Sequence, residues 1–379
     1  MKKIRVLQIL SDSNIGGAGR LLYNLAECID KRYFEFIYVF PNGSELYPLF
    51  KKQDPLNKIY TISSGKDRSS DLKAAFELSR IIKMSHPHII HTHSSLFARM
   101  GAKLAGFDKN RVVYTKHCVF ELPRITKSKA FRYAYRIADD VLAANIIAVA
   151  DSAKDELVAY GVRSEKIKVI INGVKPLPES SDEEKTALRK RLGIKENDFA
   201  VGISARLEAY KGHKTLIEAA AISKKEGIKN IVFLIMGEGS YGRALKDYAK
   251  ALGVTDRVKF LGFKTNVADY VNIFDVNVNC SVGTETSSLA ISEGLSLGKP
   301  IVASDFGGNP NMVKNGVTGF LFKQNNAVSL YEKLVFLKNH PGVLKYMSNN
   351  AKIDFANRFS ADIMAKEYER IYRGIINNT

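Results

Sequence analysis

The chain has 379 residues, too many for one core of ordinary size, and its 45% hydrophobic and 25% charged content excludes a disordered or fibrous protein. No run of about 18 apolar residues is present, so the sequence predicts no membrane-spanning helix. The net charge is +18, and residues 1–175 hold 29 Lys and Arg against 17 Asp and Glu, while the remainder holds 28 against 22. This imbalance favours anionic partners such as phospholipid, a diphosphate or nucleic acid.

The three cysteines, Cys28, Cys118 and Cys280, are scattered and lack the spacing of metal ligands. Reduced thiols in a cytoplasmic protein are the expectation. Residues 4–10 are predicted as a first β-strand rather than part of a secretion signal, because Arg5 and Gln8 interrupt the apolar run.

A glycine-rich turn follows this strand and contains Gly16, Gly17 and Gly19, and a helix is predicted over residues 21–28. Strand, turn and helix in this order allow the backbone to approach a phosphate or sugar. The spacing differs from the Gly-x-Gly-x-x-Gly dinucleotide fingerprint. A tight turn that needs only small residues is the alternative.

Further strands alternate with helices through the first half of the chain, which predicts a parallel, doubly wound sheet. Ligands of such sheets bind at the carboxyl ends of the strands. The strands are predicted over residues 34–40, 58–62, 88–90, 111–115, 145–149 and 167–171, and the helices include 71–84, 96–105 and 152–160.

Three histidines lie at predicted strand ends: His91 and His93 after one strand, and His117 after the next. The His-x-His pair lacks a third zinc ligand at a fitting spacing. A nucleophilic dyad of His117 with Cys118 is disfavoured, because neighbouring side chains on an extended backbone point apart. A hydrogen-bonded loop residue is the simpler alternative for His117.

Residues 109–136 are basic and interleaved with aromatic residues. Such a segment can lie on an anionic bilayer surface or bind nucleic acid. A charged face that contacts only solvent is the third alternative. The candidates for membrane contact are Arg124, Lys127, Lys129 and Arg132.

A polar, proline-containing stretch at residues 176–184 predicts a linker between domains 1–174 and 175–358. The second half alternates again, with strands expected over 199–203, 231–236, 258–261, 276–279, 300–304 and 319–322. Arg206 and Lys211 follow its first strand, where two cations can neutralise a departing diphosphate. Surface salt bridges are the alternative. The last helix, within residues 359–379, carries Tyr368 and Tyr372 at helical spacing, which predicts packing.

Residues 283–304 are central to the prediction. Glu285 precedes a helix, Glu293 lies on it eight residues later, and Thr286 to Ser288 are N-cap formers. The free amides of such a helix start bind anions. A carboxylate pair of this spacing is by itself more often two solvated helix charges.

Together with Arg206-Leu-x-x-x-Lys211-Gly and the Gly237-Glu238-Gly239 turn, the Glu285-x7-Glu293 element resembles the retaining glycosyltransferases of family 4, which have the GT-B fold. Relatives commonly carry Glu-Gly-Phe-Gly where this chain has Glu285-Thr-Ser-Ser. The resemblance implies two doubly wound Rossmann-like domains, an active site in the interdomain cleft, and a C-terminal helix that crosses back to the first domain.

The resemblance also implies a UDP- or GDP-linked sugar as co-substrate, with no other cofactor. No metal is expected, and the chain has no Asp-x-Asp triplet. It assigns the transferred sugar to His117 and Glu285, the ribose to Glu293, and the base to Phe263. The diphosphate is assigned to Gly16, Gly17, Arg206, Lys211, Ser287, Ser288, Leu289 and Ala290, and further sugar or acceptor contacts to His93, Gly237 and Glu238.

We therefore predict a retaining glycosyltransferase. Since many relatives glycosylate lipid-linked acceptors, we expect a lipid-linked or cell-surface polysaccharide precursor as acceptor, and peripheral association with the inner face of the cell membrane. The alternatives are a nucleotide-sugar epimerase of the same fold and a basic nucleic-acid-binding protein. The last leaves the Glu285 and Arg206 motifs unexplained, so no nucleic-acid partner is expected.

Overall fold

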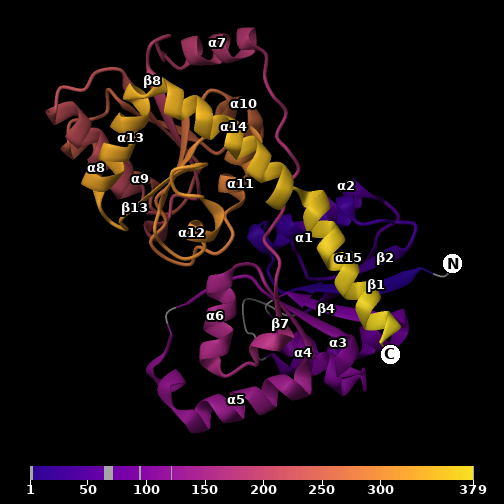
Figure 1. The fold of residues 1–379 in the computed structure, drawn as a ribbon. Helices are drawn as coiled ribbons and strands as arrows, with labels where there is room; N and C mark the ends of the chain where they lie inside the picture. Colours follow the sequence, from indigo (N-terminus) through magenta and orange to yellow (C-terminus); the bar gives the residue numbers. More distant parts are fainter. Residues whose placement is uncertain (1–2, 64–70, 94, 121, 379) are drawn as a thin grey trace. The chain divides into compact units, whose positions relative to one another are not determined.

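The computed structural model describes residues 3–63, 71–93, 95–120 and 122–378. The chain forms two compact units, one made of Met1–Gly173 with Ala361–Thr379 and the other of Val174–Ser360. The predicted domain limits at residues 174 and 358 fall within two residues of these. The last helix, α15 (Ala361–Asn377), therefore belongs to the first unit, although the whole second unit precedes it in sequence (Figure 1).

The first unit contains, within the described residues, a seven-stranded sheet in the order β3-β2-β1-β4-β5-β6-β7. Every pair of neighbouring strands is parallel. The strand order reverses between β1 and β4, and ligands of doubly wound sheets bind at such a reversal. The strands are β1 (Ile4–Leu10), β2 (Phe34–Pro41), β3 (Lys58–Ile62), β4 (Ile89–His93), β5 (Val112–Lys116), β6 (Asn145–Ala148) and β7 (Ile167–Val169).

Helices cover both faces of this sheet. Alternate side chains of β1 point to opposite faces. Val6 and Leu10 pack with residues of α1, α2 and α15, whereas Leu7 and Ile9 pack with residues of α3, α4 and α6. The helices are α1 (Gly17–Cys28), α2 (Leu46–Gln53), α3 (Leu72–Ser85), α4 (Leu96–Leu104), α5 (Lys129–Leu142) and α6 (Asp151–Tyr160), with the short 3-10 helices η1 (Lys109–Arg111), η2 (Arg124–Lys127) and η3 (Ser164–Lys166).

The second unit is built, in its described residues, on a six-stranded parallel sheet in the order β10-β9-β8-β11-β12-β13. Its strands are β8 (Phe199–Ser204), β9 (Ile231–Met236), β10 (Val258–Gly262), β11 (Val276–Asn279), β12 (Ile301–Ser304) and β13 (Gly319–Phe322). Its helices are α7 (Asp182–Arg191), η4 (Ala209–Lys211), α8 (His213–Lys225), α9 (Gly242–Ala251), α10 (Val267–Asn272), α11 (Leu289–Ser296), α12 (Asn309–Met312), α13 (Ala327–Asn339) and α14 (Pro341–Arg358).

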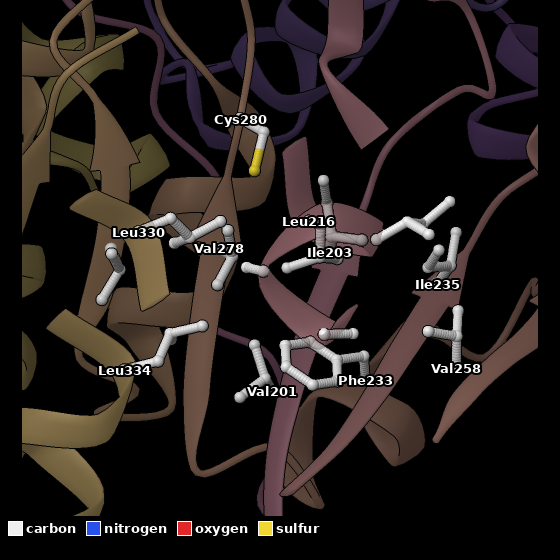
Figure 2. Packing of buried hydrophobic residues seen from close by; sticks show 14 of the residues in the cluster. Val201, Ile203, Leu216, Phe233, Ile235, Val258, Val278, Cys280, Leu330 and Leu334 are labelled. Atoms are coloured by element: carbon white, nitrogen blue, oxygen red, sulfur yellow. The ribbon is translucent and has the colours of Figure 1, made fainter. Parts of the chain in front are cut away.

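The main core of the second unit lies between the sheet and helices α8, α9 and α13. Figure 2 shows Val201 and Ile203 of β8 beside Phe233 of β9, with Leu216 of α8 and Leu330 of α13 among the side chains packed on them. A smaller cluster on the opposite face joins Ala200, Val232 and Leu234 to α10. The loops at the carboxyl ends of β8 and β11 are thus held by strands that are buried on both faces.

The predicted α/β class with two doubly wound parallel sheets is confirmed, and each of the 13 described strands overlaps a predicted one. Several boundaries differ by one or two residues, and two were wrong by three or four residues. β4 continues to His93, because His91 and His93 pair with β1 and β5. Helix α1 begins at Gly17, since the Arg20 amide already bonds to the Gly16 carbonyl at 3.0 Å. The position of the active site in an interdomain cleft stays a prediction.

Candidate active site

In the second unit, the strand order reverses between β8 and β11, and the predicted motifs gather there. The loop after β8 carries Arg206 and Lys211, and the loop after β11 carries Glu285 and leads into α11. A cavity of about 10 Å³ lies at this point, lined among others by Lys211, Asn279 and Ala290. A cavity of this size is about large enough for one water molecule.

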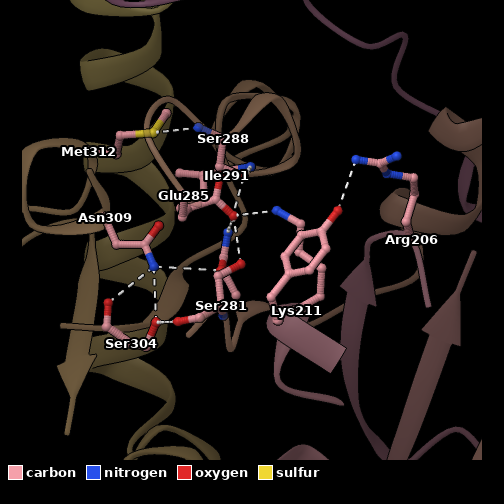
Figure 3. Close-up of polar contacts among 11 residues, drawn as sticks. Arg206, Lys211, Ser281, Glu285, Ser288, Ile291, Ser304, Asn309 and Met312 are labelled. Atoms are coloured by element: carbon pink, nitrogen blue, oxygen red, sulfur yellow. Dashed lines mark hydrogen bonds and ion pairs between the residues drawn. The ribbon is translucent and has the colours of Figure 1, made fainter. Parts of the chain in front are cut away.

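Lys211 and Glu285 form an ion pair at this reversal, with the Lys211 Nζ 2.8 Å from the Glu285 Oε2 (Figure 3). The Ser281 hydroxyl and the Asn279 amide donate to the same oxygen at 2.6 and 3.2 Å. Burial by itself would raise the pKa of the Glu285 carboxyl, but the Lys211 charge and these hydrogen bonds hold it below its usual value. Glu285 is therefore a buried, ionised carboxylate.

The backbone around Lys211 explains how the lysine reaches this carboxylate. The loop after β8 ends in the 3-10 turn η4, and the Val282 amide donates to the Tyr210 carbonyl at 2.8 Å. Gly212 follows with φ of +68°, and a Cβ there would lie 1.9 Å from the Cys280 carbonyl oxygen. Only glycine fits this close approach, which places Lys211 against the end of β11.

The loop that bears Glu285 is supported from a second side by residues 305–309. The Gly308 amide donates to the Glu285 carbonyl at 3.1 Å. A Cβ on Gly308 would lie 1.5 Å from the Thr286 carbonyl oxygen, so the two backbones touch. Thr284 has φ of +50°, a strained value for a β-branched residue. Strain of this kind is common at functional sites.

Arg206 is exposed and does not join the ion pair. Its guanidinium donates to the Tyr210 hydroxyl at 2.9 Å, as Figure 3 shows at the edge of the cluster. The structure thus brings Arg206 and Lys211 onto one loop but gives them different partners. Their predicted roles in holding a diphosphate stay predictions.

At the start of α11, the backbone amides of two residues make no hydrogen bond to any residue that the structure describes. Ser288 is the N-cap, and its hydroxyl accepts from the Ile291 amide at 3.4 Å. The Ser288 amide donates to the Met312 sulfur at 3.1 Å. In the described part of the chain, no hydrogen bond is made by the amides of Leu289 and Ala290. The Leu289 and Ala290 amides, at two of the four predicted anion-binding positions 287 to 290, can therefore donate to an anion.

Glu293 lies on α11, two turns beyond Glu285, and is half-buried. Its carbonyl accepts from the Ser296 hydroxyl at 2.7 Å. The predicted ribose contact at Glu293 remains untested.

The Gly237-Glu238 turn packs on the loop that carries Arg206. The Leu207 amide donates to the Glu238 carbonyl at 2.9 Å, and the Glu238 side chain accepts from the Phe263 amide at 3.3 Å. Phe263 is 61% exposed, and its predicted contact with the base stays a prediction. These contacts join the predicted base and sugar residues Gly237, Glu238 and Phe263 on one side of Arg206.

In the first unit, Gly16 is the N-cap of α1 and Gly17 its first residue. A Cβ on Gly17 would meet no atom within 4 Å, so the backbone here is open. The predicted phosphate contact at these glycines stays a prediction.

Three buried histidines lie at the reversal of strand order in the first unit. The His93 Nδ1 is 2.9 Å from the His117 Nε2, and the His93 Nε2 is 3.1 Å from the Gln8 Oε1. The His91 nitrogens lie 2.7 Å from the Tyr372 and Thr115 hydroxyls. Burial lowers the pKa of His91 to about 3 and that of His117 to about 4, and it holds the pKa of His93 well below its usual value. All three rings are neutral at pH 7.

The sequence missed several members of these two sites. Asn279 was predicted only as the end of a strand and Tyr372 only as packing, and Ser281 was not singled out. Gln8 offered a signal, because it is a polar residue between apolar ones in the first strand, and the structure shows that it is completely buried. Neither the Arg206-Lys211 motif nor the Glu285-Glu293 motif indicates by itself that Glu285 pairs with Lys211.

The basic stretch, residues 109–136, includes η1, β5, η2 and the first half of α5, and the four predicted membrane contacts Arg124, Lys127, Lys129 and Arg132 are exposed. Exposed apolar side chains accompany them, with Ile125 at 54% and Tyr133 at 59%. Across the described ranges, no helix is both long and apolar enough to cross a bilayer. Nor do the residues that the structure describes include three or more His, Cys, Asp or Glu side chains grouped to hold a metal ion.

Comparison with known families gives two matches that together span most of the chain. Residues 15–176 match the model of Glycosyltransferase Family 4, and residues 184–354 match that of Glycosyl transferases group 1. The boundary between the two matches coincides with the linker before α7.

Relatives of known activity extend over the chain. The Escherichia coli UDP-Gal:alpha-D-GlcNAc-diphosphoundecaprenol alpha-1,3-galactosyltransferase is 30% identical over 387 residues, which cover 99% of this chain and 98% of the relative. The alpha-monoglucosyldiacylglycerol synthase of Acholeplasma laidlawii is 26% identical over 315 residues, covering 79% and 77%.

Solved structures share the fold. A glycosyltransferase from Rickettsia africae superimposes with a TM-score of 0.85 at 22% identity, covering both chains completely. Anabaena HepE in complex with UDP gives 0.82 at 22% identity, covering 98% of this chain and all of the other. These neighbours and the two doubly wound sheets show that the chain has the GT-B fold of glycosyltransferases. The chain belongs to the group 1 glycosyltransferases of family 4.

Proposed function

We propose that this glycosyltransferase moves a sugar from a nucleoside diphosphate donor, UDP-linked, to a lipid-linked acceptor, with retention of the anomeric configuration. The Escherichia coli relative, named for a UDP-galactose donor and a diphosphoundecaprenol acceptor, supports this choice of substrates. The Acholeplasma laidlawii relative, named as a diacylglycerol glycolipid synthase, supports a lipid acceptor more generally.

The observation that carries the proposal is the ionised Glu285, paired with Lys211 beside the two unbonded amides of Leu289 and Ala290. A carboxylate held ionised in a buried site stabilises positive charge that develops on a sugar ring. Amides and cations stabilise negative charge on a departing diphosphate. Glu285 and the two amides are only a few residues apart. One loop therefore offers stabilisation for both charges that develop during glycosyl transfer.

In the proposed reaction, the bond between the anomeric carbon and the diphosphate oxygen breaks, and its electron pair leaves with the diphosphate. The acceptor hydroxyl oxygen attacks the anomeric carbon from the same face. Its proton passes to an oxygen of the departing phosphate, so no separate base is needed. Neutral His117 and ionised Glu285 contact the sugar, and neither adds positive charge beside the developing oxocarbenium ion.

Three measurements test the proposal. UDP-, GDP- and ADP-linked sugars are screened by thermal shift, since a ligand of the folded state raises the melting temperature. Transfer to a lipid-diphosphate acceptor is then followed with the responding donor, and the anomeric coupling of the product is read by NMR. We expect a response to a UDP-sugar and an unchanged anomeric configuration. Failure of every nucleotide sugar to stabilise the protein, or an inverted product, would contradict the proposal.

A matched pair of variants ties the activity to the site. Glu285→Gln should reduce kcat by about 100-fold or more, the range for loss of one preorganised electrostatic contact. Glu332→Gln, the same change on an exposed position of α13, should leave it unchanged. An epimerase would instead convert the donor without any acceptor. A nucleic-acid-binding protein would show steeply salt-dependent binding of oligonucleotides.

We further propose that η2 and α5 rest on an anionic membrane surface. Their exposed Arg and Lys side chains, with Ile125 and Tyr133 between them, combine charge and apolar area as interfacial helices do. Each basic residue near such a surface contributes about 1 kcal/mol.

Vesicle sedimentation tests this second proposal. Lys127→Gln with Lys129→Gln should weaken binding to phosphatidylglycerol vesicles by roughly 30-fold, from about 2 kcal/mol. Lys250→Gln with Lys345→Gln, both exposed in the second unit, is the matched control. Equal losses in both double variants, or equal binding to neutral phosphatidylcholine vesicles, would contradict a specific membrane face.

A further inference from the structure

A continuous path of buried hydrogen bonds runs from the C-terminal helix to His117. The Gln8 Nε2 donates to the Tyr372 hydroxyl at 3.1 Å, and the Gln8 Oε1 lies 3.1 Å from the His93 Nε2. The His93 Nδ1 then lies 2.9 Å from the His117 Nε2. Gln8, His93 and Tyr372 are completely buried and come from β1, β4 and α15. The path therefore couples three elements far apart in sequence.

The direction of every bond on this path follows from the Gln8 amide. Its oxygen can only accept, so the neighbouring His93 Nε2 carries a proton. A neutral His93 then has no proton on Nδ1, and this nitrogen accepts from the His117 Nε2. A neutral His117 is consequently protonated on Nε2, and its Nδ1 is an acceptor.

The second arm of the network is consistent with the same arrangement. The Tyr372 hydroxyl accepts from Gln8 and has one proton to give, and the His91 Nδ1 lies 2.7 Å away. His91 then carries its proton on Nε2, 2.7 Å from the Thr115 hydroxyl. The protons of Gln8, Tyr372 and the three histidine rings on these arms then each meet one acceptor, as expected for a buried network.

Ionisation of any one ring would disturb this order. The His91 and His93 rings are 4.3 Å apart, and those of His93 and His117 are 5.1 Å apart. A charge on any one ring would therefore lie beside at least one neutral ring in a buried region. Burial lowers the pKa of all three histidines, in agreement with a neutral network.

We propose that Tyr372, acting through Gln8 and His93, is a positioning residue that fixes His117 as the Nε2-protonated tautomer. Its effect on catalysis rests on the proposed contact of His117 with the transferred sugar. In that role, the fixed tautomer holds the His117 ring neutral and in a single hydrogen-bonding arrangement. The C-terminal helix then contributes to the reaction through its Tyr372 hydroxyl as well as through packing.

The tautomer can be measured directly, without any substrate. Protein labelled with 15N-histidine is studied by long-range 1H–15N correlation at pH 7.5, and the His117 signals are assigned by their loss in His117→Asn. We expect a protonated Nε2 and a bare Nδ1 in the wild type. In Tyr372→Phe, the Gln8 amide loses the acceptor that orients it, so His117 should become a mixture of tautomers. A protonated Nδ1 in the wild type, or an unchanged Nε2-protonated His117 in Tyr372→Phe, would overturn the proposal.

A matched variant separates the hydroxyl from the loss of packing. Tyr368 is one turn away on α15 and equally buried, and its ring packs on His91 at 5.6 Å, off the path from Gln8 to His117. Tyr368→Phe should leave the His117 tautomer unchanged. Gln8→Leu, which removes the amide itself, should mix the tautomers as Tyr372→Phe does. Melting temperatures of all variants establish that they are folded.

Kinetics then decide whether the tautomer matters. Tyr372→Phe should lower kcat roughly tenfold or more, as when the outer partner of a functional histidine is removed, and change the donor KM by less than about twofold. Mixed tautomers with unchanged kcat would support the assignment of Tyr372 and overturn the catalytic contact of His117. A lower kcat with an unchanged tautomer would overturn the positioning role instead.

Discussion

The buried histidines make a quantitative prediction about acid stability. His91, His93 and His117 stay neutral in the folded protein, because burial lowers the pKa of each below the ordinary 6.5. In the unfolded chain they titrate near that value. Between pH 6.5 and about 4, the unfolded chain therefore binds protons that the folded protein does not. The contribution of the three neutral histidines to the free energy of unfolding is fully present above pH 6.5. It is lost as the pH falls through this window.

The magnitude follows from the linkage relation. At pH 5, each histidine that is neutral only when folded lowers the free energy of unfolding by about 2 kcal/mol, from 1.5 pH units at about 1.4 kcal/mol each. His91 and His117 together give roughly 4 kcal/mol, and His93 acts in the same direction, so the loss is a large part of the stability of a typical domain. We expect the first unit to unfold at mildly acidic pH, before most carboxylates titrate.

Urea unfolding followed by circular dichroism at pH 7.5, 6.5, 5.5 and 5.0 measures this effect. The urea midpoint should fall steeply below pH 6.5. In His91→Gln, the pH dependence should be smaller by about one proton, or about 1.4 kcal/mol per pH unit. His340→Gln, at an exposed position after α13, is the control and should follow the wild type. A midpoint that does not change between pH 7.5 and 5.0, or equal slopes in the two variants, would refute the reasoning.

Three further predictions concern the second unit. Lys211→Met leaves the Glu285 carboxylate buried without its cation and should lower the free energy of unfolding in urea by about 3 kcal/mol, and adding Glu285→Gln should recover most of the loss. Gly308→Ala would place a methyl group 1.5 Å from the Thr286 carbonyl oxygen, so the melting temperature should fall by several degrees or the protein should fail to fold. Arg206→Ala should reduce transfer by about 100-fold with an unchanged melting temperature, because Arg206 is exposed, and near-wild-type turnover would contradict its phosphate role.

The strands were predictable because their signal is local. Runs such as Ile231–Met236 are apolar along their whole length and are bounded by turn residues, as buried parallel strands are. Their order in the sheet was not predictable from such runs. Strand order is what brings Lys211 beside Glu285, although 74 residues separate them. The two motifs could each be recognised, but their contact depends on the fold.

The contacts of the three buried histidines also could not be predicted from local sequence. His91 was expected just beyond a strand, because a polar residue after an apolar run usually marks the strand end. It lies inside β4 and is completely buried, since Tyr372 and Thr115 satisfy both ring nitrogens. Tyr372 is supplied from the far end of the sequence, 281 residues away. No local pattern records a partner at that distance.

The ion pair between Lys211 and Glu285 implies different roles for Lys211 and Arg206, the two cations on the loop after β8. Lys211 and Glu285 together are electrically neutral, so Lys211 serves first to keep a buried carboxylate ionised. The net positive charge for a diphosphate must then come mainly from Arg206, assisted by the amides of Leu289 and Ala290. Because Arg206 is exposed, its attraction is screened by salt, whereas the buried pair is not. Donor KM should therefore rise with ionic strength in the wild type and much less in Arg206→Ala, while the effect of Glu285→Gln on kcat should be the same at every salt concentration.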